Sequence, residues 1–186
     1  MTDREWEMAR VFIGIGANIA PEANIRRALT LLGERVQLVA LSTFYRTPAL
    51  EREGQPPFLN GVVAVETAIA PAALKQEVLR GIEEALGRQR TADKYAPRPI
   101  DLDIAVYDQQ VIATADLTIP DPEITRRPFL AIPLCELAPD LVLPDSGRRV
   151  CEVAAALDAS AMEPLPEFTR ELREQLLPAP ANQPTE

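Results

Sequence analysis

The chain has 186 residues, of which 47% are hydrophobic and 25% are charged. This size and mix are typical of one globular domain with a real core, and they exclude a wholly disordered chain. The longest apolar runs are too short to span a bilayer, and the charged first ten residues lack the apolar segment of a secretory signal. We therefore expect a cytoplasmic protein with no membrane contact, built as one domain over residues 10–160, with extensions at 1–9 and 161–186.

The formal net charge is −9 and the chain contains no histidine. A strongly negative protein is a poor partner for nucleic acid, because most of that affinity comes from neutralised phosphates. The lack of histidine excludes Ser-His-Asp and Cys-His nucleophile pairs and HExxH zinc sites, so any catalysis must use carboxylates, arginines, lysines or bound ions. The two cysteines, Cys135 and Cys151, are expected to be small buried residues or bystanders.

Hydrophobic periodicity predicts a regular succession of elements. They are, in chain order, a strand at 11–16, a helix at 21–35, strands at 36–45 and 58–67, a helix from 71 to about 87 and a strand at 100–107. The order β-α-β-β-α-β is typical of an α+β, ferredoxin-like fold, in which a mainly antiparallel sheet carries its helices on one face and leaves the other for a ligand or for loops.

C-terminal additions are expected beyond this core. Residues 129–137 predict a further apolar helix that adds to the core, and the spacing of Phe168, Leu172 and Leu176 predicts a short helix. The remaining proline-rich residues are expected to form a mobile tail.

The strand at 100–107 carries two aspartates, although aspartate is depleted in strands. Strict alternation would point Leu102, Ile104 and Val106 to the core, and Asp101 and Asp103 together to the other face, roughly 7 Å apart. Bound Mg²⁺ would explain the pair, because it prefers one or two carboxylates plus substrate phosphates. A solvated edge strand, or carboxylates paired with arginines, would explain it as well.

The loop before this strand is basic, with Arg88, Arg90, Lys94 and Arg98 against only Asp93. Arginine forks suit phosphate oxygens, so a positive loop beside two aspartates fits a metal-bound polyphosphate. A surface salt-bridge cluster is the alternative. Other phosphate motifs fail, because the glycines at 14 and 16 lack the third glycine of a dinucleotide fingerprint and no P-loop occurs. These glycines are expected to allow a turn or a close approach.

A second pocket is suggested by the dipeptide at 47–48 together with Phe58, Asn60 and Phe129. Two flat rings and one amide could sandwich a planar heterocycle and read its edge. The alternative is that these residues are ordinary turn residues and core aromatics.

Taken together, the ordered motifs resemble the 6-hydroxymethyl-7,8-dihydropterin pyrophosphokinase family of folate biosynthesis. They are Gly-Ile-Gly-Ala-Asn at 14–18, Ser-Thr-Phe-Tyr-Arg-Thr-Pro at 42–48, Phe-Leu-Asn at 58–60, the segment 82–90, Ala-Pro-Arg-Pro-Ile-Asp-Leu-Asp-Ile at 96–104, and the segments 127–129 and 133–139. The resemblance covers roughly residues 10–155.

The resemblance implies that ATP donates pyrophosphate to the hydroxymethyl oxygen of the pterin and that AMP leaves. It implies two Mg²⁺ ions held by Asp101 and Asp103, loops at 46–57 and 91–99 that close over the substrates, and other folate-pathway enzymes as partners. The implied catalytic residues are Arg88, Arg98, Asp101 and Asp103; those that bind ATP are Glu83, Arg88, Arg90, Tyr95, Arg98, Ile104, Asp121 and Arg127; and those that bind the pterin are Thr47, Pro48, Leu50, Phe58, Asn60, Asp101 and Phe129.

The chain departs from the family pattern at Asp121, where the family usually has a histidine that touches the nucleotide phosphates. A carboxylate would repel a triphosphate unless it faces a metal or an arginine, and Arg126 or Arg127 could supply that arginine. Tyr95 in place of tryptophan and Phe58 in place of tyrosine are mild changes. Asp121 keeps open the alternative of a non-catalytic descendant that binds pterin or nucleotide. A module that binds RNA or protein is disfavoured by the net charge.

Overall fold

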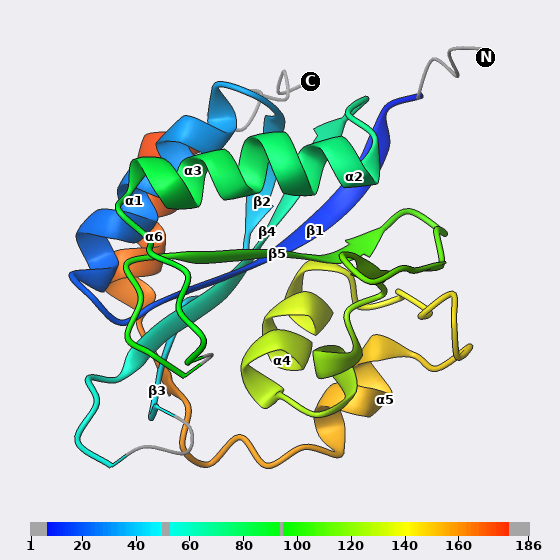
Figure 1. The fold of residues 1–186 in the computed structure, drawn as a ribbon. Coiled ribbons are helices and arrows are strands. Elements are labelled where there is room, and N and C mark those ends of the chain that lie inside the picture. Colours follow the sequence, from blue (N-terminus) through cyan, green and yellow to red (C-terminus); the bar gives the residue numbers. More distant parts are fainter. Residues whose placement is uncertain (1–6, 50–52, 94, 179–186) are drawn as a thin grey trace, which may run out of the picture.

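The computed structural model describes residues 7–49, 53–93 and 95–178 (Figure 1). The central sheet has the order β5-β1-β4-β3-β8, with β2 also paired to β4, and its pairings are antiparallel. A small second sheet joins β6 to β7. The strands are β1 (Ala9–Ala17), β2 (Gln37–Leu41), β3 (Tyr45–Thr47), β4 (Phe58–Thr67), β5 (Asp101–Tyr107), β6 (Ile112–Ala113), β7 (Thr118–Ile119) and β8 (Glu163–Pro164).

The helices lie on both faces of the central sheet. They are α1 (Pro21–Gly33), α2 (Pro71–Ala73), η1 (Leu74–Leu79), α3 (Arg80–Ala85), η2 (Pro122–Thr125), α4 (Pro128–Leu137), α5 (Val150–Ala155) and α6 (Pro166–Leu176). Figure 1 shows α2, η1 and α3 as one continuous helix above β5, with α1 and α6 behind it and with α4 and α5 below. The strand order, together with the packing of α1 and α3 on one face of the sheet, confirms the ferredoxin-like prediction.

Two large clusters of buried residues form the core on the two faces of the sheet, and a small third one lies between α4 and α5. The first packs α1, η1, α3 and α6 against one face through residues such as Ile13, Leu29 and Leu74. The second packs α4 and α5 against the other face through residues such as Val62 and Leu134. The predicted helix at 129–137 is confirmed as α4. Because α4 and α5 cover part of the second face, only the rest of that face remains for a ligand.

The strand β5 does not alternate throughout, which corrects one expectation. Leu102 and Ile104 lie in the first core cluster as predicted, but Val106 lies in the second. The register explains the difference, since Phe12 pairs with Val106 and Ile13 pairs with Ile104, so that Ala105 is an extra residue in β5. Such a β-bulge moves the side chains that follow it in the strand to the opposite faces of the sheet. Asp101 and Asp103 precede the bulge and share one face.

The strand predicted at 36–45 is divided into β2 and β3 by residues 42–44. Ser42 and Val62 exchange hydrogen bonds: the Ser42 N–H donates to the Val62 carbonyl and the Val62 N–H donates to Ser42 Oγ. Phe44 is fully buried and packs edge-on to Phe168 of α6, with the ring centroids 5.7 Å apart. Gly61 makes room for this ring, because a Cβ at that position would lie 2.7 Å from it.

The helix over residues 71–85 contains a wider π-helical turn at η1, where the Arg80 N–H donates to the Lys75 carbonyl. The predicted apolar positions Leu74, Val78, Ile82 and Leu86 are all buried. Their constant spacing of four takes 12 residues for three turns, whereas three α-helical turns take about 11. The π-helical turn absorbs the extra residue and keeps the apolar face on the sheet.

The C-terminal part contains a disulfide between Cys135 of α4 and Cys151 of α5, which differs from the expectation of two separate cysteines. Sequence spacing did not reveal it, because only the packing of α4 on α5 brings the two Cα atoms within 5.0 Å. The short helix predicted near residue 165 is confirmed as α6. The predicted mobile tail lies mostly outside the described residues. Among those described, no helix is long and apolar enough to cross a membrane.

Candidate functional site

A cavity of about 260 Å³ opens on the part of the sheet that α4 leaves uncovered. Its wall combines residues from β1, β3, β4 and β5 with the loop before β5 and the segment before α4. Eleven of the predicted site residues line it: Thr47, Pro48, Phe58, Asn60, Tyr95, Arg98, Asp101, Asp103, Asp121, Arg127 and Phe129. The fold therefore brings the two pockets suggested by the sequence into one cavity.

Arginine 88 connects the helix α3 to the first residue of β5. Its Nη1 donates to Glu83 Oε1 and to Asp101 Oδ1, each at 2.6 Å. Glu83 is only 2% exposed, and its Oε1 also accepts the Leu102 N–H at 2.9 Å. Burial raises the pKa of Glu83, and the Leu102 N–H and the Arg88 guanidinium oppose that rise. The buried carboxylate thus fixes Arg88, which in turn orients Asp101.

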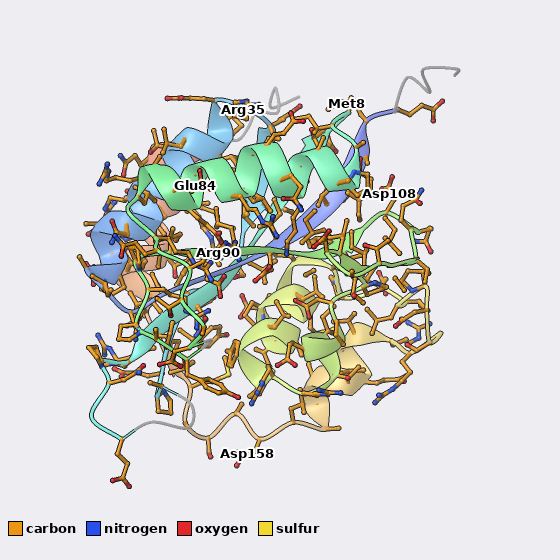
Figure 2. The ribbon with its side chains drawn as sticks, viewed as in Figure 1. Met8, Arg35, Glu84, Arg90, Asp108 and Asp158 are labelled. Atoms are coloured by element: carbon orange, nitrogen blue, oxygen red, sulfur yellow. A yellow bond between two sulfur atoms is a disulfide. The ribbon has the colours of Figure 1, made fainter. Side chains whose placement is uncertain are left out.

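The outer side of this cluster carries another arginine. Arg90 Nη2 donates to Glu83 Oε2 at 2.8 Å, and the Arg90 side chain is 56% exposed. Figure 2 shows the labelled Arg90 below α3, on the loop that continues toward β5, and Glu84 on the outer surface of that helix. Two adjacent glutamates therefore differ completely in role, since Glu83 is buried and Glu84 is exposed.

Arginine 98 holds the other oxygen of Asp101. Its Nη1 donates to Asp101 Oδ2 at 2.9 Å, and its backbone N–H donates to Asn18 Oδ1 at 2.8 Å. Its guanidinium also lies 5.9 Å from the centre of the Phe58 ring, a cation–π distance. Arg98 therefore stands between the acidic part of the cavity and its aromatic part.

Asp103 pairs with a residue that was not predicted as part of the site. Lys75 Nζ lies 2.8 Å from Asp103 Oδ1, and the exposed fractions of the two side chains are 19% and 45%. Burial against the cavity wall and the nearby Asp101 carboxylate raise the pKa of Asp103, and Lys75 opposes this shift. Each aspartate thus has its own cationic partners.

The aromatic part of the cavity is built around Asn60. Its Nδ2 donates to Thr47 Oγ1 at 2.7 Å across the pair of strands β3 and β4. A Cβ at Gly16 would lie 2.8 Å from Asn60 Oδ1, so the close approach expected of this glycine is confirmed. Phe58 and Phe129 both line the cavity nearby. Two rings and a fixed amide can hold a flat, hydrogen-bonding heterocycle.

Asp121 lies on the same cavity wall as Asp103, in the segment before η2. Its Oδ1 accepts the Glu123 N–H at 2.9 Å. Arg126 and Arg127, one of which could have been its partner, pair instead with Glu123 at 3.7 and 2.6 Å. Burial raises the pKa of Asp121 to about 6, while the Glu123 N–H and Lys75 oppose the rise.

The remaining predicted residues fall outside the cavity lining in the described part of the chain. Glu83, Arg88 and Arg90 lie beside it, in the cluster already described. Ile104 is 2% exposed and packs in the first core cluster, so its side chain points away from the cavity. Leu50 and Lys94 lie outside the described residues.

Several cavity residues were missed by the sequence prediction. Gln55 Nε2 donates to the Tyr95 carbonyl at 2.9 Å and so joins the two loops that flank the cavity. Glu123 and Leu130 line the wall, and Lys75 reaches Asp103 from η1. The four-residue spacing of the helix could have revealed the π-helical turn that presents Lys75. No comparable pattern marks Gln55 or Leu130.

The donor set of the acidic part fits a metal ion that is shared with a phosphate ligand. Asp101 and Asp103 present carboxylates to one cavity, but the described residues contain no group of three or more acidic, cysteine or histidine side chains able to hold a metal. Mg²⁺ is commonly bound by one or two carboxylates with waters and phosphates completing its shell. The pair is therefore suited to a metal–phosphate complex rather than to a metal bound by protein alone.

Known proteins resemble this chain in both sequence and fold. The profile of the family described as 7,8-dihydro-6-hydroxymethylpterin-pyrophosphokinase (HPPK) matches residues 12–139. The 2-amino-4-hydroxy-6-hydroxymethyldihydropteridine pyrophosphokinase of Pseudomonas aeruginosa is 39% identical over 161 residues, which are 84% of this chain and 97% of the relative. The protein of that name from Synechocystis is 34% identical over 88% of this chain and 84% of the relative.

A solved structure of Plasmodium falciparum HPPK-DHPS superposes with a TM-score of 0.65 at 12% sequence identity. The match covers 93% of this chain and 47% of that chain, so this chain spans about half the length of the solved protein. At this identity the likeness shows the fold alone. The sequence relationships are much closer, and by them the chain belongs to the 7,8-dihydro-6-hydroxymethylpterin-pyrophosphokinase family.

Proposed function

We propose that the chain transfers pyrophosphate from ATP to the hydroxymethyl group of 6-hydroxymethyl-7,8-dihydropterin, in folate biosynthesis. The hydroxymethyl oxygen bonds to the β-phosphorus, the bond between that phosphorus and the oxygen leading to the α-phosphorus breaks, and AMP leaves. The hydroxyl proton passes to solvent. One observation carries the proposal: a single cavity contains both a slot for a flat heterocycle and a cluster of aspartates and arginines.

The pterin is assigned to the aromatic part of the cavity. Phe58 and Phe129 stack on its two faces, and the amide of Asn60, fixed by Thr47, reads its polar edge. Pro48 closes the same wall, and Leu50 is assigned here by the family resemblance alone. Asp101 is assigned to the hydroxymethyl group, because it lines the same cavity and is held by Arg98, whose guanidinium lies near the Phe58 ring.

The triphosphate is assigned to the acidic and basic part. Arg88, Arg90 and Arg98 offer guanidinium donors to phosphate oxygens, and Tyr95 and Arg127 extend this wall. Glu83 holds Arg88 and Arg90 in place. Ile104, whose side chain lies in the core, is assigned to the nucleotide by the family resemblance alone. Asp101 and Asp103 would hold two Mg²⁺ ions, which would neutralise charge on the transferring group when bound. Positioning and charge stabilisation supply most of the rate in such transfers, so the mechanism requires no side-chain base.

The direct test mixes purified protein with ATP, Mg²⁺ and 6-hydroxymethyl-7,8-dihydropterin, and measures AMP and the pterin diphosphate together. Equal amounts of both, lost when EDTA is added, would support the reaction, the donor group and the metal requirement. Release of ADP instead of AMP would contradict pyrophosphate transfer.

A second outcome has a specific structural basis, because Asp121 stands on the cavity wall where the resemblance expects a histidine. If pterin binds, as followed by its fluorescence, but no AMP forms, the chain is a non-catalytic member of the family. Asp121→His would then be the first variant to test for restored transfer.

A further inference from the structure

Lys75 makes a contact at the acidic part of the cavity that the roles assigned above leave unexplained. Its ammonium donates to Asp103 Oδ1 at 2.8 Å from the neighbouring helix, and the Lys75 side chain is 19% exposed. Asp101 has two arginine partners, Arg88 and Arg98. Lys75 therefore pairs with the Asp103 carboxylate as the two arginines pair with that of Asp101.

The local helix geometry presents Lys75 to this position. Lys75 and Glu83 are eight residues apart, whereas two α-helical turns take about 7.2 residues. The π-helical turn at η1 absorbs the difference, so both side chains face β5: Glu83 accepts the Leu102 N–H, and Lys75 reaches Asp103. In a regular α-helix the two side chains would point in directions that differ by about the rotation of one residue around the helix axis.

The ammonium of Lys75 would compete with a metal ion for the Asp103 carboxylate. Asp103 Oδ1 is held by an ammonium at the distance of a charge-assisted hydrogen bond. Carboxylate oxygens are also the ligands that a divalent ion prefers. An ammonium and a metal ion cannot share the same lone pairs at close range, because their charges repel. Binding of a metal to Oδ1 therefore requires Lys75 to leave it.

We propose that Lys75 is a positioning residue that holds the Asp103 carboxylate toward the cavity in the ligand-free protein and competes with a divalent cation for it. This inference rests on the proposed metal role of Asp103. Lys75 keeps two like-charged aspartates in place before ligands arrive and lowers the affinity of the empty site for metal alone. The metal ion then binds best together with the triphosphate, whose negative charge compensates for the cation that it displaces.

The first experiment titrates Mn²⁺ into the ligand-free protein and measures free Mn²⁺ by electron paramagnetic resonance. Lys75→Met keeps the length and removes the charge, and is expected to bind Mn²⁺ about tenfold more tightly than the unchanged protein. Lys75→Arg keeps a cation and is expected to remain within about twofold. An equal or weaker affinity in Lys75→Met, or no binding by it, would overturn the inference.

Two further variants separate this inference from its foundation. Arg126→Met removes an exposed cation from the segment near the cavity, and an affinity gain equal to that of Lys75→Met would mean that net charge alone is responsible. Asp103→Asn tests the metal site itself. If it binds Mn²⁺ as well as the unchanged protein does, the metal role of Asp103 fails, whatever Lys75 does.

A measurement on the unchanged protein avoids dependence on the folding of any Lys75 variant. The chain contains only two lysines, Lys75 and Lys94, so lysine labelled at Cε and Nζ gives two side-chain signals, which a Lys94→Arg sample assigns. Mg²⁺ alone is expected to shift the Lys75 signal, with a midpoint equal to that of metal binding. A Lys75 signal that stays fixed while Mg²⁺ binds would contradict the competition.

Discussion

Glu83 and Arg88 form an ion pair at 2.6 Å in which the Glu83 side chain is only 3% exposed. The two residues are close in sequence but belong to the end of α3 and to the loop that follows. The pair turns this loop back under the helix and directs the arginine toward Asp101 at the start of β5. Because a buried carboxylate is costly without its partners, the pair links the stability of the fold to the geometry of the site.

Replacing Glu83 with alanine is expected to destabilise the fold by about 3 kcal/mol, because it removes the acceptor of the Leu102 N–H and leaves Arg88 in a buried position with one partner fewer. Urea unfolding followed by circular dichroism measures the change. Glu84→Ala is the matched control on the exposed side of the helix and is expected to lie within about 0.5 kcal/mol of the unchanged protein. Similar losses in both variants would refute the structural role of Glu83.

Replacing Asp103 with alanine is expected to lower the rate of pyrophosphate transfer by about a thousandfold, since it removes a carboxylate assigned to metal binding. Pterin binding, followed by fluorescence titration, should change little because the aromatic part of the cavity is untouched. Asp116→Ala removes an exposed carboxylate elsewhere and should retain the full rate. Near-normal turnover in Asp103→Ala would remove Asp103 from the proposed mechanism.

Asp121 is expected to make stability depend on pH. Its pKa is about 6 in the folded protein against an ordinary value of 3.8, so the folded state binds this proton more tightly than the unfolded chain does. Ionisation of Asp121 therefore lowers the free energy of unfolding as the pH rises from about 4 to about 6. Above that range the carboxylate is fully ionised and the whole loss of stability persists.

Asp121→Asn removes this cost but keeps an oxygen that can accept the Glu123 N–H. The variant is expected to be more stable than the unchanged protein by about 1 kcal/mol at pH 8, once solvent screening is allowed for, and the gain should shrink toward pH 5. Denaturant unfolding at several pH values measures it. A gain that is constant across this range would show that ionisation of Asp121 is not its cause.

Replacing Gly16 with alanine is expected to weaken pterin binding by about tenfold, because the new Cβ would lie 2.8 Å from Asn60 Oδ1 and would displace the amide from Thr47. Fluorescence titration of the pterin measures the loss. Gly81→Ala is the matched control: it has open space at its Cβ and lies in a helix, so it should leave binding unchanged and raise stability by up to about 1 kcal/mol. Equal pterin affinity in both variants would contradict the role of the Gly16–Asn60 approach.

Local patterns in the sequence determined the order of strands and helices and the location of the chemistry. Alternation placed Asp101 and Asp103 on one face, and the concentration of arginines before them predicted an anion site, because both patterns depend only on backbone period and charge. The four-residue apolar spacing in the helix at 71–85 also contained the signal of a π-helical turn, since it exceeds the α-helical period.

Tertiary structure alone decided how these parts meet. The bulge at Ala105 moves the later side chains of β5 to the opposite faces of the sheet. The packing of α4 on α5 joins Cys135 to Cys151, and the π-helical turn at η1 brings Lys75 to Asp103. The bulge and the disulfide depend on residues far apart in the chain, so no local pattern specifies them. The apolar spacing signals the turn at η1, but only the packing of that helix on β5 decides that Lys75 meets Asp103. The cavity exists for the same reason: helix packing covers one part of the sheet face and leaves the part with the aspartates, arginines and aromatic rings open.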